Sequence, residues 1–296
     1  GFNHILFADD IFLFAKANIQ DCTTPFNLFL YFCEVSSQIC NATKSKLFFS
    51  WNTHSDTQCS ISSLTNMPFV QDLGKYLGMP LLTKRKSTPT FQPLLDKIHT
   101  RIHAWQSKLL SQAGKLTLII SILSPLIYYQ MQTIVLPWST TSSIDRSTRD
   151  FLWGDTQTQG HVYLINWDML TKPKVRVRLG IRDSKTTNDA FLMNQAWRIW
   201  RNLHSLLAKF LSQKHYQTTD FLQTTSHTGS HLWKALLQGR DLLQGSLRWI
   251  IRNGCNINFW TDHWIPPRPI RGLIHGLLLP HEYEFKVARM IIDTYQ

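Results

Sequence analysis

HILFADDIFLF, residues 4–14, places two adjacent aspartates between two runs of apolar residues. The runs His4–Phe7 and Ile11–Phe14 have the length and the Ile, Leu and Phe content of short strands, and Ala8, Asp9 and Asp10 fit a tight turn between them. Two-residue hairpin turns favour Asn-Gly or Asp-Gly because their backbone needs positive φ. The stretch therefore predicts a β-hairpin whose turn residues are set by function rather than by turn geometry.

The carboxylates of Asp9 and Asp10 repel each other, and apolar surroundings strengthen the repulsion. A compensating cation is therefore expected, and Mg²⁺ is the usual one, since it takes one or two carboxylates together with water and substrate phosphate. Such a pair suits two-metal phosphoryl transfer, in which one ion activates an attacking 3′-hydroxyl and the other stabilises the leaving pyrophosphate. The alternative is an exposed acidic turn between strands.

The 296 residues carry 31 Lys and Arg against 19 Asp and Glu, which gives a net charge of +12 at pH 7. A surplus of this size favours a polyanionic partner, first nucleic acid and second an anionic membrane surface. An ordinary basic protein is the simplest alternative. With 43% hydrophobic residues the chain can build a core and is not compositionally disordered.

The five cysteines are odd in number and have no C-x-x-C spacing, which indicates neither a disulfide framework nor a zinc site. Free thiols fit a reducing compartment, so we expect the nucleus or the cytoplasm. The chain begins with Gly1 and continues directly into strand-like sequence, without a visible secretory signal. A fragment is expected, and not a secreted protein.

Hydrophobic periodicity predicts a mainly helical chain with a few short strands. The clearest helix is Pro93–Leu110, where apolar residues recur every three or four positions and basic residues lie off that stripe. The other expected helices are at Phe26–Cys33, after Gly114 to about Gln132 and bent or interrupted at Pro125, at Asn188–Phe210, and from His231. The expected strands are at Lys46–Ser50 and before Trp264, with a bent strand or hairpin at Lys75–Leu82. Loops are expected at 52–66 and 217–230, and a linker at Trp138–Ser143.

Leu116–Trp138 carries no charge and is long enough to cross a bilayer. Thr, Ser, Gln and Pro are distributed through it, and it continues the amphipathic pattern that precedes it. A buried helical arm is therefore favoured over a membrane span, and no membrane partner is expected.

Phe7-Ala8-Asp9-Asp10 resembles the aspartate-pair motif of reverse transcriptases, in the form found in LINE-type (non-LTR) retrotransposons of plants. Further motifs follow in that family's order. Ser45–Ser50 resembles the lysine-bearing segment that closes the palm, Tyr76–Leu81 a segment near the primer grip, and Trp105–Lys115 the thumb signature. The motifs that resemble the region after the thumb are Phe151–Gly154, Asn166–Asp168, Leu179–Arg182 and Trp260–Trp264.

This resemblance implies an α+β fold with a partial polymerase palm at 1–82, a mainly helical thumb at 83–138, and a mixed, mostly helical region at 139–296 that ends before any zinc-binding cluster. It also implies that Asp9 and Asp10 are the catalytic, Mg²⁺-binding pair of an RNA-directed DNA polymerase, with an RNA template and a DNA primer as partners. Lys46 is implied to lie near the incoming nucleotide. The residues implied to bind nucleic acid are Tyr76, Leu77, Gly78, Met79, Lys97, Arg101, Lys108 and Lys115.

A polymerase palm also needs a metal-binding aspartate on an earlier strand and fingers that bind the nucleotide. Neither can lie in this chain, because the pair stands at residues 9–10. We therefore expect a polymerase fragment that is inactive alone, and the alternative is a non-catalytic, basic nucleic-acid-binding remnant. Ser36-Ser37-Gln38 and Val175–Arg178 replace glycines that this family usually has at turns.

Trp197–Arg201 combines two tryptophans with two arginines on a predicted helix. Contact with the bases or the backbone of a nucleic acid is one interpretation. The favoured interpretation is that Trp197 and Trp200 pack on the inner face of the helix while the arginines are solvated, because large aromatic side chains usually supply core contacts.

Overall fold

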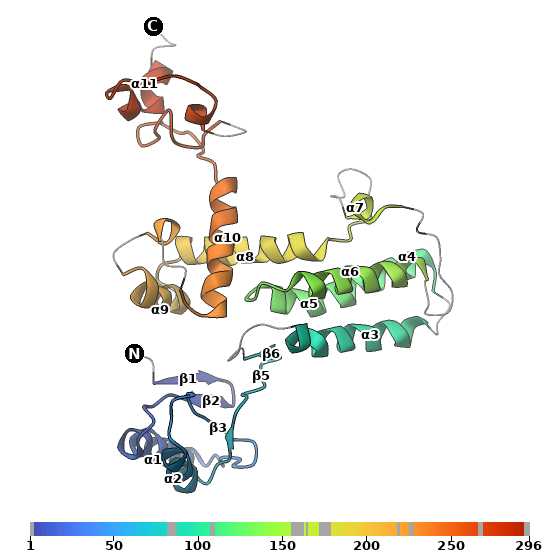
Figure 1. Ribbon diagram of the computed structural model, residues 1–296, viewed down its shortest axis with the longest axis vertical. Coiled ribbons are helices and arrows are strands. Elements are labelled where there is room, and N and C mark those ends of the chain that lie inside the picture. The colour runs from blue at the N-terminus through green and yellow to red at the C-terminus, as the bar shows by residue number, and fades with distance from the viewer. Residues whose placement is uncertain are drawn as a thin grey trace. The chain divides into compact units, whose positions relative to one another are not determined.

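The computed structural model describes residues 3–81, 88–106, 110–154, 163, 165–171, 179–217, 220–224, 228–265 and 269–292. The chain divides into two compact units, Gly1–Lys86 and Ser87–Gln296. The fold is α+β, mainly helical with a few short strands, as the sequence predicts (Figure 1). The predicted boundary at 138/139 falls inside the second unit, and the assignment of palm, thumb and post-thumb regions stays a prediction.

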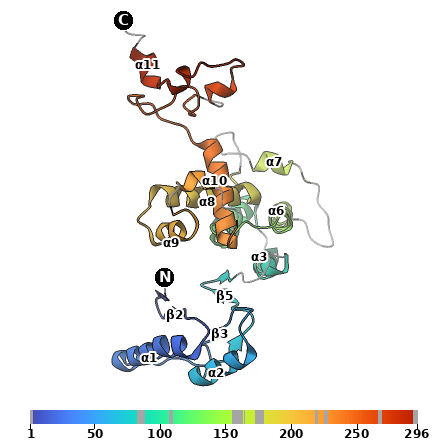
Figure 2. The same cartoon turned by 60° about the vertical axis from the view of Figure 1, so that its left-hand side comes forward.

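The first unit combines short strands with two helices. β1 pairs antiparallel with β2, β5 pairs antiparallel with β6, and β3 runs parallel to β4. Helices α1 and α2 lie side by side (Figure 2). The bounds are β1 (His4–Phe7), β2 (Asp10–Leu13), α1 (Ile19–Ser36), β3 (Leu47–Phe48), α2 (Ser55–Thr65), β4 (Phe69–Val70), β5 (Lys75–Tyr76) and β6 (Met79–Pro80). The predicted hairpins at both ends of this unit are therefore confirmed.

Helix α1 is longer than the sequence predicts. It begins at Ile19 and not at Phe26, because Asn18 caps its first turn by accepting the Asp21 N–H over 2.7 Å. At its other end Ser37 has a φ of 55°, the left-handed conformation that glycine adopts most easily. The glycine that the resemblance leads one to expect is thus replaced by serine at a position that needs positive φ.

The predicted loop at 52–66 is wrong, because most of it forms α2. Ser and Thr favour loops since their hydroxyls compete for the backbone, but here these hydroxyls bond back onto the helix itself. The Thr65 hydroxyl, for example, donates to the Ile61 carbonyl over 3.0 Å. Ile61 and Thr65 are also the only buried side chains among the described residues of the first unit.

The second unit consists of helices and short helical turns. Its helices are α3 (Gln92–Gln106), α4 (Gln112–Leu118), a π-helical turn (Ile119–Leu123), α5 (Ser124–Met131), α6 (Trp138–Trp153), α7 (Trp167–Leu170), α8 (Ser184–Arg201), α9 (Leu206–His215), α10 (His231–Ser246) and α11 (Val287–Ile292), with 3₁₀ turns at Thr88–Phe91, Phe221–Gln223, Ile270–Gly272 and Glu282–Glu284. Helix α6 packs against both α3 and α8, and α10 crosses α8 (Figure 1).

Helix α3 carries the apolar stripe that the sequence predicts. Its buried residues are Leu94, Leu95, Ile98, Ile102 and Trp105. Lys97 and Arg101 are exposed, so they do lie off the stripe. Lys108 and Leu109, which the prediction also included, lie outside the described residues.

A helical segment follows at 112–131, and its α-helical pattern is interrupted by a π turn before Pro125, where the sequence predicts a bend or an interruption. Pro125 has no N–H to continue the α-helical pattern, and the preceding turn widens to a π turn in which the Ser124 N–H bonds the Ile119 carbonyl. The buried residues Ile119, Leu123, Ile127 and Met131 lie along this segment, which confirms a buried helical arm. No helix in the part of the chain that the structure describes is long and apolar enough to cross a membrane.

Two further predictions are wrong, one because buried side chains extend a helix and the other because a capping residue starts a new one. Trp138–Ser143 forms the start of α6 instead of a linker, and the side chains of Thr140 and Thr141 are buried there. The single helix predicted at Asn188–Phe210 is broken between α8 and α9. Ser205 starts the second helix by accepting the Ala208 N–H over 3.2 Å.

The strand expected between α10 and Trp264 does not form among the described residues. That segment instead folds back on the C-terminal residues through an isolated bridge between Asn258 and Lys286. The five cysteines are free thiols. A location in the nucleus or the cytoplasm stays a prediction.

Helices α8, α9 and α10 share one hydrophobic core around Trp233, whose side chain is fully buried. The His215 ring of α9 stacks on it with centroids 4.2 Å apart and planes 4° from parallel. Burial lowers the pKa of His215, and the charge of Lys214 lowers it further, so this imidazole is neutral at pH 7.

Asn188 joins α8 to the connection between α5 and α6. Its amide Nδ2 donates to the carbonyls of Met131 at 2.8 Å and Ile134 at 2.9 Å, and its Oδ1 accepts the Leu136 N–H at 2.8 Å. The side chain is only 2% exposed, so every bond is sheltered from water.

Gly239 of α10 lies directly against the backbone of α8. A Cβ atom at this position would lie 2.3 Å from the backbone carbonyl oxygen of Leu192, closer than any non-bonded contact permits. The backbones of the two helices therefore meet only because residue 239 has no side chain.

We expect Gly239→Ala to destabilise the second unit. The added methyl must push α8 and α10 apart, and overpacking of this kind costs about 1–3 kcal/mol. Gly245→Ala in the same helix is the matched control, because nothing lies within 4 Å of its Cβ position. It should stabilise the protein by up to about 1 kcal/mol through helix propensity. Urea unfolding followed by circular dichroism measures both, and equal effects would contradict the close crossing.

Candidate active site

The aspartates occupy a two-residue hairpin turn and the residue after it. Phe7 pairs with Asp10, so Ala8 and Asp9 form the turn and Asp10 opens β2. Ala8 has a φ of 52°, in the left-handed region that a non-glycine residue enters at a cost of about 1–2 kcal/mol. Strain of this kind collects at functional sites, which agrees with a turn sequence set by function.

The two carboxylates are available to a cation. Asp9 and Asp10 are both exposed, and neither forms an ion pair with a described Lys or Arg. Two hard oxygen donors fit Mg²⁺, which commonly takes one or two carboxylates and completes its shell with water and phosphate. Within the described ranges no group of three His, Cys, Asp or Glu side chains could hold a metal ion, so the hairpin supplies two carboxylates and no third.

The predicted primer-grip segment lies against the aspartate hairpin. The Tyr76 ring meets the Phe12 ring of β2 edge to face, with centroids 4.6 Å apart and planes at 86°. Leu77 and Gly78, with φ of 48° and 80°, form the turn between β5 and β6, and Met79 pairs with Tyr76. Phe12 was not among the residues predicted from the sequence. Its only signal was its place in the apolar run after the aspartates.

The Tyr76 hydroxyl is buried and has no hydrogen-bond partner among the described residues. A buried hydroxyl without a partner is unfavourable by about 1–3 kcal/mol. Lys46, which was expected near the nucleotide, is exposed directly before β3. No hydrogen bond or ion pair joins it to either aspartate in the described part of the chain.

The basic residues expected to bind nucleic acid have different surroundings. Lys97 and Arg101 share the exposed side of α3. Lys115 is half-buried, and its ammonium lies beside Gly154, where a Cβ would come within 3.0 Å of Nζ. Gly154 ends α6, and a cation at the C-terminal end of a helix is favourable, so Lys115 has a structural role as well. Lys108 lies outside the described residues.

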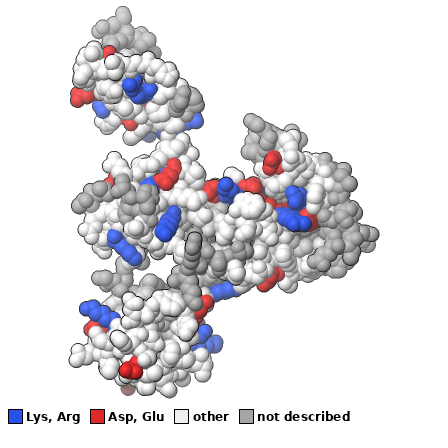
Figure 3. Space-filling model, in the orientation of Figure 1, with Lys and Arg blue, Asp and Glu red and all other residues white. Residues whose placement is uncertain are grey.

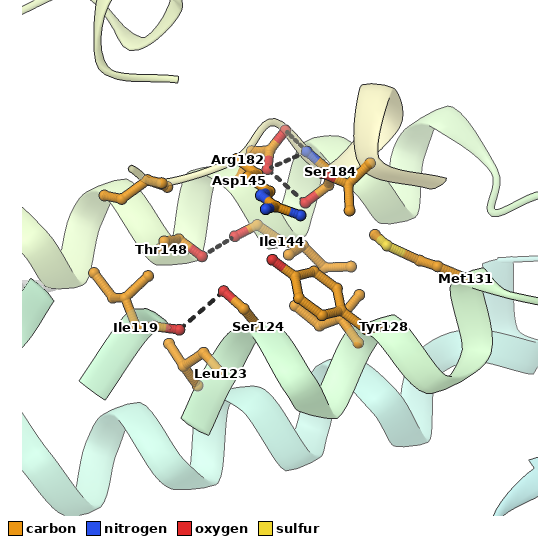
Figure 4. Close-up of a pocket in the computed structure, with 13 residues that line it drawn as sticks. Ile119, Leu123, Ser124, Tyr128, Met131, Ile144, Asp145, Thr148, Arg182 and Ser184 are labelled. Carbon is orange, nitrogen blue, oxygen red and sulfur yellow. Dashed lines mark hydrogen bonds between the residues drawn. The ribbon is translucent and has the colours of Figure 1, made fainter. Parts of the chain in front are cut away.

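A second acidic site lies where α6 meets the start of α8 (Figure 4). Asp145 accepts hydrogen bonds from the Ser184 hydroxyl at 2.6 Å and the Ser184 N–H at 3.2 Å. Burial raises the pKa of Asp145 to about 7 despite these bonds, and the charge of Asp183 adds to the rise. Arg182 and Tyr128 line the same pocket as Asp145 (Figure 4).

Asp183, the neighbouring carboxylate, caps α8. Burial acts to raise its pKa as well, but hydrogen bonds from the Thr186 N–H and hydroxyl, both at 2.7 Å, outweigh burial. The pKa of Asp183 therefore lies below its usual value, so Asp183 loses its proton at a lower pH than Asp145 does. The sequence analysis missed Asp145. Asp145 could have been found from its place in the sequence. It follows Ile144 directly and stands four residues after Thr141, so it lies beside the buried residues of α6.

No family model matches this chain. Two proteins of Arabidopsis thaliana are similar to it. One is named a putative ribonuclease H protein and is 34% identical over 203 residues, which are 67% of this chain and 33% of that protein. The other is an uncharacterized mitochondrial protein, 27% identical over 139 residues, which are 46% of this chain and 90% of that protein.

The chain thus spans about a third of the length of the putative ribonuclease H protein. Both relatives come from a plant, as the resemblance implies. Neither name mentions a polymerase.

We expect the stability of the second unit to fall as the pH rises from about 4 to about 7. The pKa of Asp145 is about 7 in the folded chain and ~3.9 in an unfolded one. The folded state therefore binds the proton more tightly, and its stabilisation is complete below pH 4 and lost above pH 7. Three pKa units set an upper limit of ~4 kcal/mol.

Asp145→Asn should remove this dependence, because the amide oxygen still accepts the Ser184 bonds and carries no charge. Urea unfolding at pH 5 and pH 8 measures the difference between the variant and the natural chain. The variant should gain relative stability at pH 8. A difference that does not change with pH would show that the carboxyl group titrates with an ordinary pKa.

Proposed function

We propose that this chain is part of an RNA-directed DNA polymerase of a plant non-LTR retrotransposon. Asp9 and Asp10 belong to its metal site, an RNA template and a DNA primer are its partners, and the chain alone is inactive. The observation that carries the proposal is the strained aspartate turn, against which the second hairpin packs through Phe12 and Tyr76.

The metal that fits this site is Mg²⁺, which would polarise the attacking and leaving oxygens of a phosphoryl transfer. Asp9 would hold it from the hairpin turn and Asp10 from the first residue of β2, the positions that the register of β1 and β2 gives them. Tyr76–Met79 would position the primer terminus, because its turn projects from a hairpin fixed to β2. Lys97 and Arg101 offer cations on one exposed helix side for the phosphates of a template–primer duplex.

The aspartate hairpin exposes apolar side chains on both faces, as part of a larger β-sheet would if its other strands were removed. Successive side chains of a strand point to opposite faces, and Ile5 and Leu6 of β1 are exposed by 46% and 60%. Leu13 of β2 is 41% exposed. A two-stranded hairpin with apolar side chains uncovered on both faces is marginally stable alone, and further strands of a longer polypeptide would bury them.

The relatives support a retroelement origin at a coarser level. A ribonuclease H acts on nucleic acid, and the protein that bears this name is about three times as long as the stretch it shares with this chain. A polymerase segment beside a ribonuclease H region would account for both the name and the extra length. The net charge of +12 favours the same class of partner.

We expect the hairpin to bind Mn²⁺, the paramagnetic substitute for Mg²⁺, through Asp9 and Asp10. Mn²⁺ should broaden the backbone amide resonances of residues 8–11 in the NMR spectrum of the chain, because the two carboxylates are the nearest oxygen donors. The double variant Asp9→Asn/Asp10→Asn should abolish the broadening. Glu34→Gln, which removes an exposed carboxylate of α1, is the matched control and should leave it intact.

Primer extension on an RNA template tests the polymerase itself. The chain alone should not extend a primer with Mg²⁺. In a polypeptide that joins it to upstream palm and fingers, Asp9→Asn or Asp10→Asn should lower the extension rate by about 10²–10³-fold, the usual effect of losing one group that stabilises transition-state charge. Extension that survives the double variant would overturn the proposal.

A non-catalytic nucleic-acid-binding remnant is the second candidate, and the charge distribution favours it specifically. The second unit holds 24 Lys and Arg against 13 Asp and Glu, whereas the first unit holds seven against six. The positive surplus therefore lies almost entirely in the unit without the aspartate pair.

For this candidate, binding to an RNA–DNA duplex should survive Asp9→Ala/Asp10→Ala. Lys97→Ala and Arg101→Ala should each reduce the slope of log K against log salt by about one, since each phosphate contact releases about one counterion. Lys44→Ala in the first unit is the control with the same loss of charge. Fluorescence anisotropy from 50 to 300 mM salt, a range chosen for its steep dependence, measures the slopes. No duplex binding at the lowest salt would contradict this function.

A further inference from the structure

The end of α8 and the following helix α9 expose aromatic and basic side chains together. We define the α8–α9 surface by its exposed residues Trp197, Arg198, Arg201, Lys209, Phe210 and Lys214. The prediction for Trp197–Arg201 is half right. Trp200 is partly buried against the hydrophobic core as expected, but Trp197 is 40% exposed.

Two aromatic rings on this surface each carry a cation. The Arg201 guanidinium lies 5.7 Å from the centroid of the Trp197 ring, and the Lys214 ammonium lies 5.8 Å from that of Phe210. Both pairs are four residues apart, so one turn of helix fixes each pair. Trp197 also rests edge to face on Trp200, with centroids 5.4 Å apart, which restricts the ring.

The stretch of sequence that forms this surface is basic. Residues 190–219 contain Arg198, Arg201, Lys209 and Lys214 but no Asp or Glu. In Figure 3 blue side chains lie over α9 and the lower end of α10. Such a field attracts a polyanion.

We propose that the α8–α9 surface binds single-stranded nucleic acid by stacking bases on Trp197 and Phe210. Exposed aromatic rings offer a face to any unpaired base, and neighbouring Arg and Lys side chains can contact the phosphates on either side. A base in a duplex is already stacked, so the aromatic rings favour single strands. The site lies in the second unit and does not depend on the aspartate pair.

Fluorescence anisotropy with labelled uridine and thymidine 12-mers tests the proposal on the full chain. Trp197→Ala should weaken binding about 5- to 150-fold, the range for one stacked base. Trp138→Ala is the matched control, because Trp138 is 76% exposed at the start of α6 and has no part in the surface. Trp197→Phe keeps an aromatic face and should keep most of the affinity.

The charge is tested by a second pair of variants. Arg201→Ala should weaken binding more than Arg146→Ala, which removes a guanidinium that is 77% exposed on α6. Thermal unfolding of each variant shows whether it is folded. If Trp197→Ala fails to fold, Arg201→Ala still tests the surface, because Arg201 is exposed. The chain with Asp9→Asn/Asp10→Asn should bind the 12-mers unchanged, which separates this site from the polymerase proposal.

Three results would overturn the inference. Equal affinities of Trp197→Ala and Trp138→Ala would show that the ring does not stack on bases. Equal affinity for a duplex of the same length would show that general charge attraction alone explains the binding. Binding to vesicles of anionic phospholipid together with no binding to the 12-mers would assign the exposed rings to a membrane surface.

Discussion

The three hydrogen bonds of Asn188 hold the second unit together. Two carbonyls have no helical partner here, that of Met131 at the end of α5 and that of Ile134 in the connection to α6, and the side chain that bonds them is buried. One amide satisfies both of these carbonyls and the Leu136 N–H, so it fixes where α5 ends and how the chain turns into α6. The opposite requirement holds at Gly239, where α10 contacts α8 through bare backbone. Helix α8 is thus positioned by one side chain that must be present and by one that must be absent.

Patterns in the sequence predicted those elements that depend only on residues close to one another along the chain. The hairpins at both ends of the first unit and the stripe of α3 follow from spacing along the chain. Helix α2 and the start of α6 were missed, since Ser and Thr favour loops until hydroxyl bonds and burial decide otherwise. At the candidate site the sequence identified Asp9, Asp10 and Tyr76 but not Phe12. It could not predict the raised pKa of Asp145, because Ser184 and Asp183 approach it from a helix about forty residues away.

The two units differ in how much buried apolar surface offsets the conformational entropy that they lose on folding. The second unit buries a continuous set of apolar side chains, whereas α1 in the first unit buries none. Burial of apolar surface is the main term that offsets the conformational entropy lost on folding, so the first unit has little of its own. The positive φ of Ala8 in the aspartate turn lowers the stability of the first unit further. A site of this kind keeps its geometry only when other chain segments cover it.

The π turn before Pro125 also has a geometric consequence. Ile119, Leu123, Ile127 and Met131 follow one another at every fourth position, and all four are buried. In a regular α-helix each step of four residues rotates the side chain by about 40° too far, so such a row would wind away from its neighbours. The wider turn at Ile119–Leu123 takes up part of this excess. The π turn before the proline therefore helps a row of residues spaced by four to stay on one buried side of the helical segment.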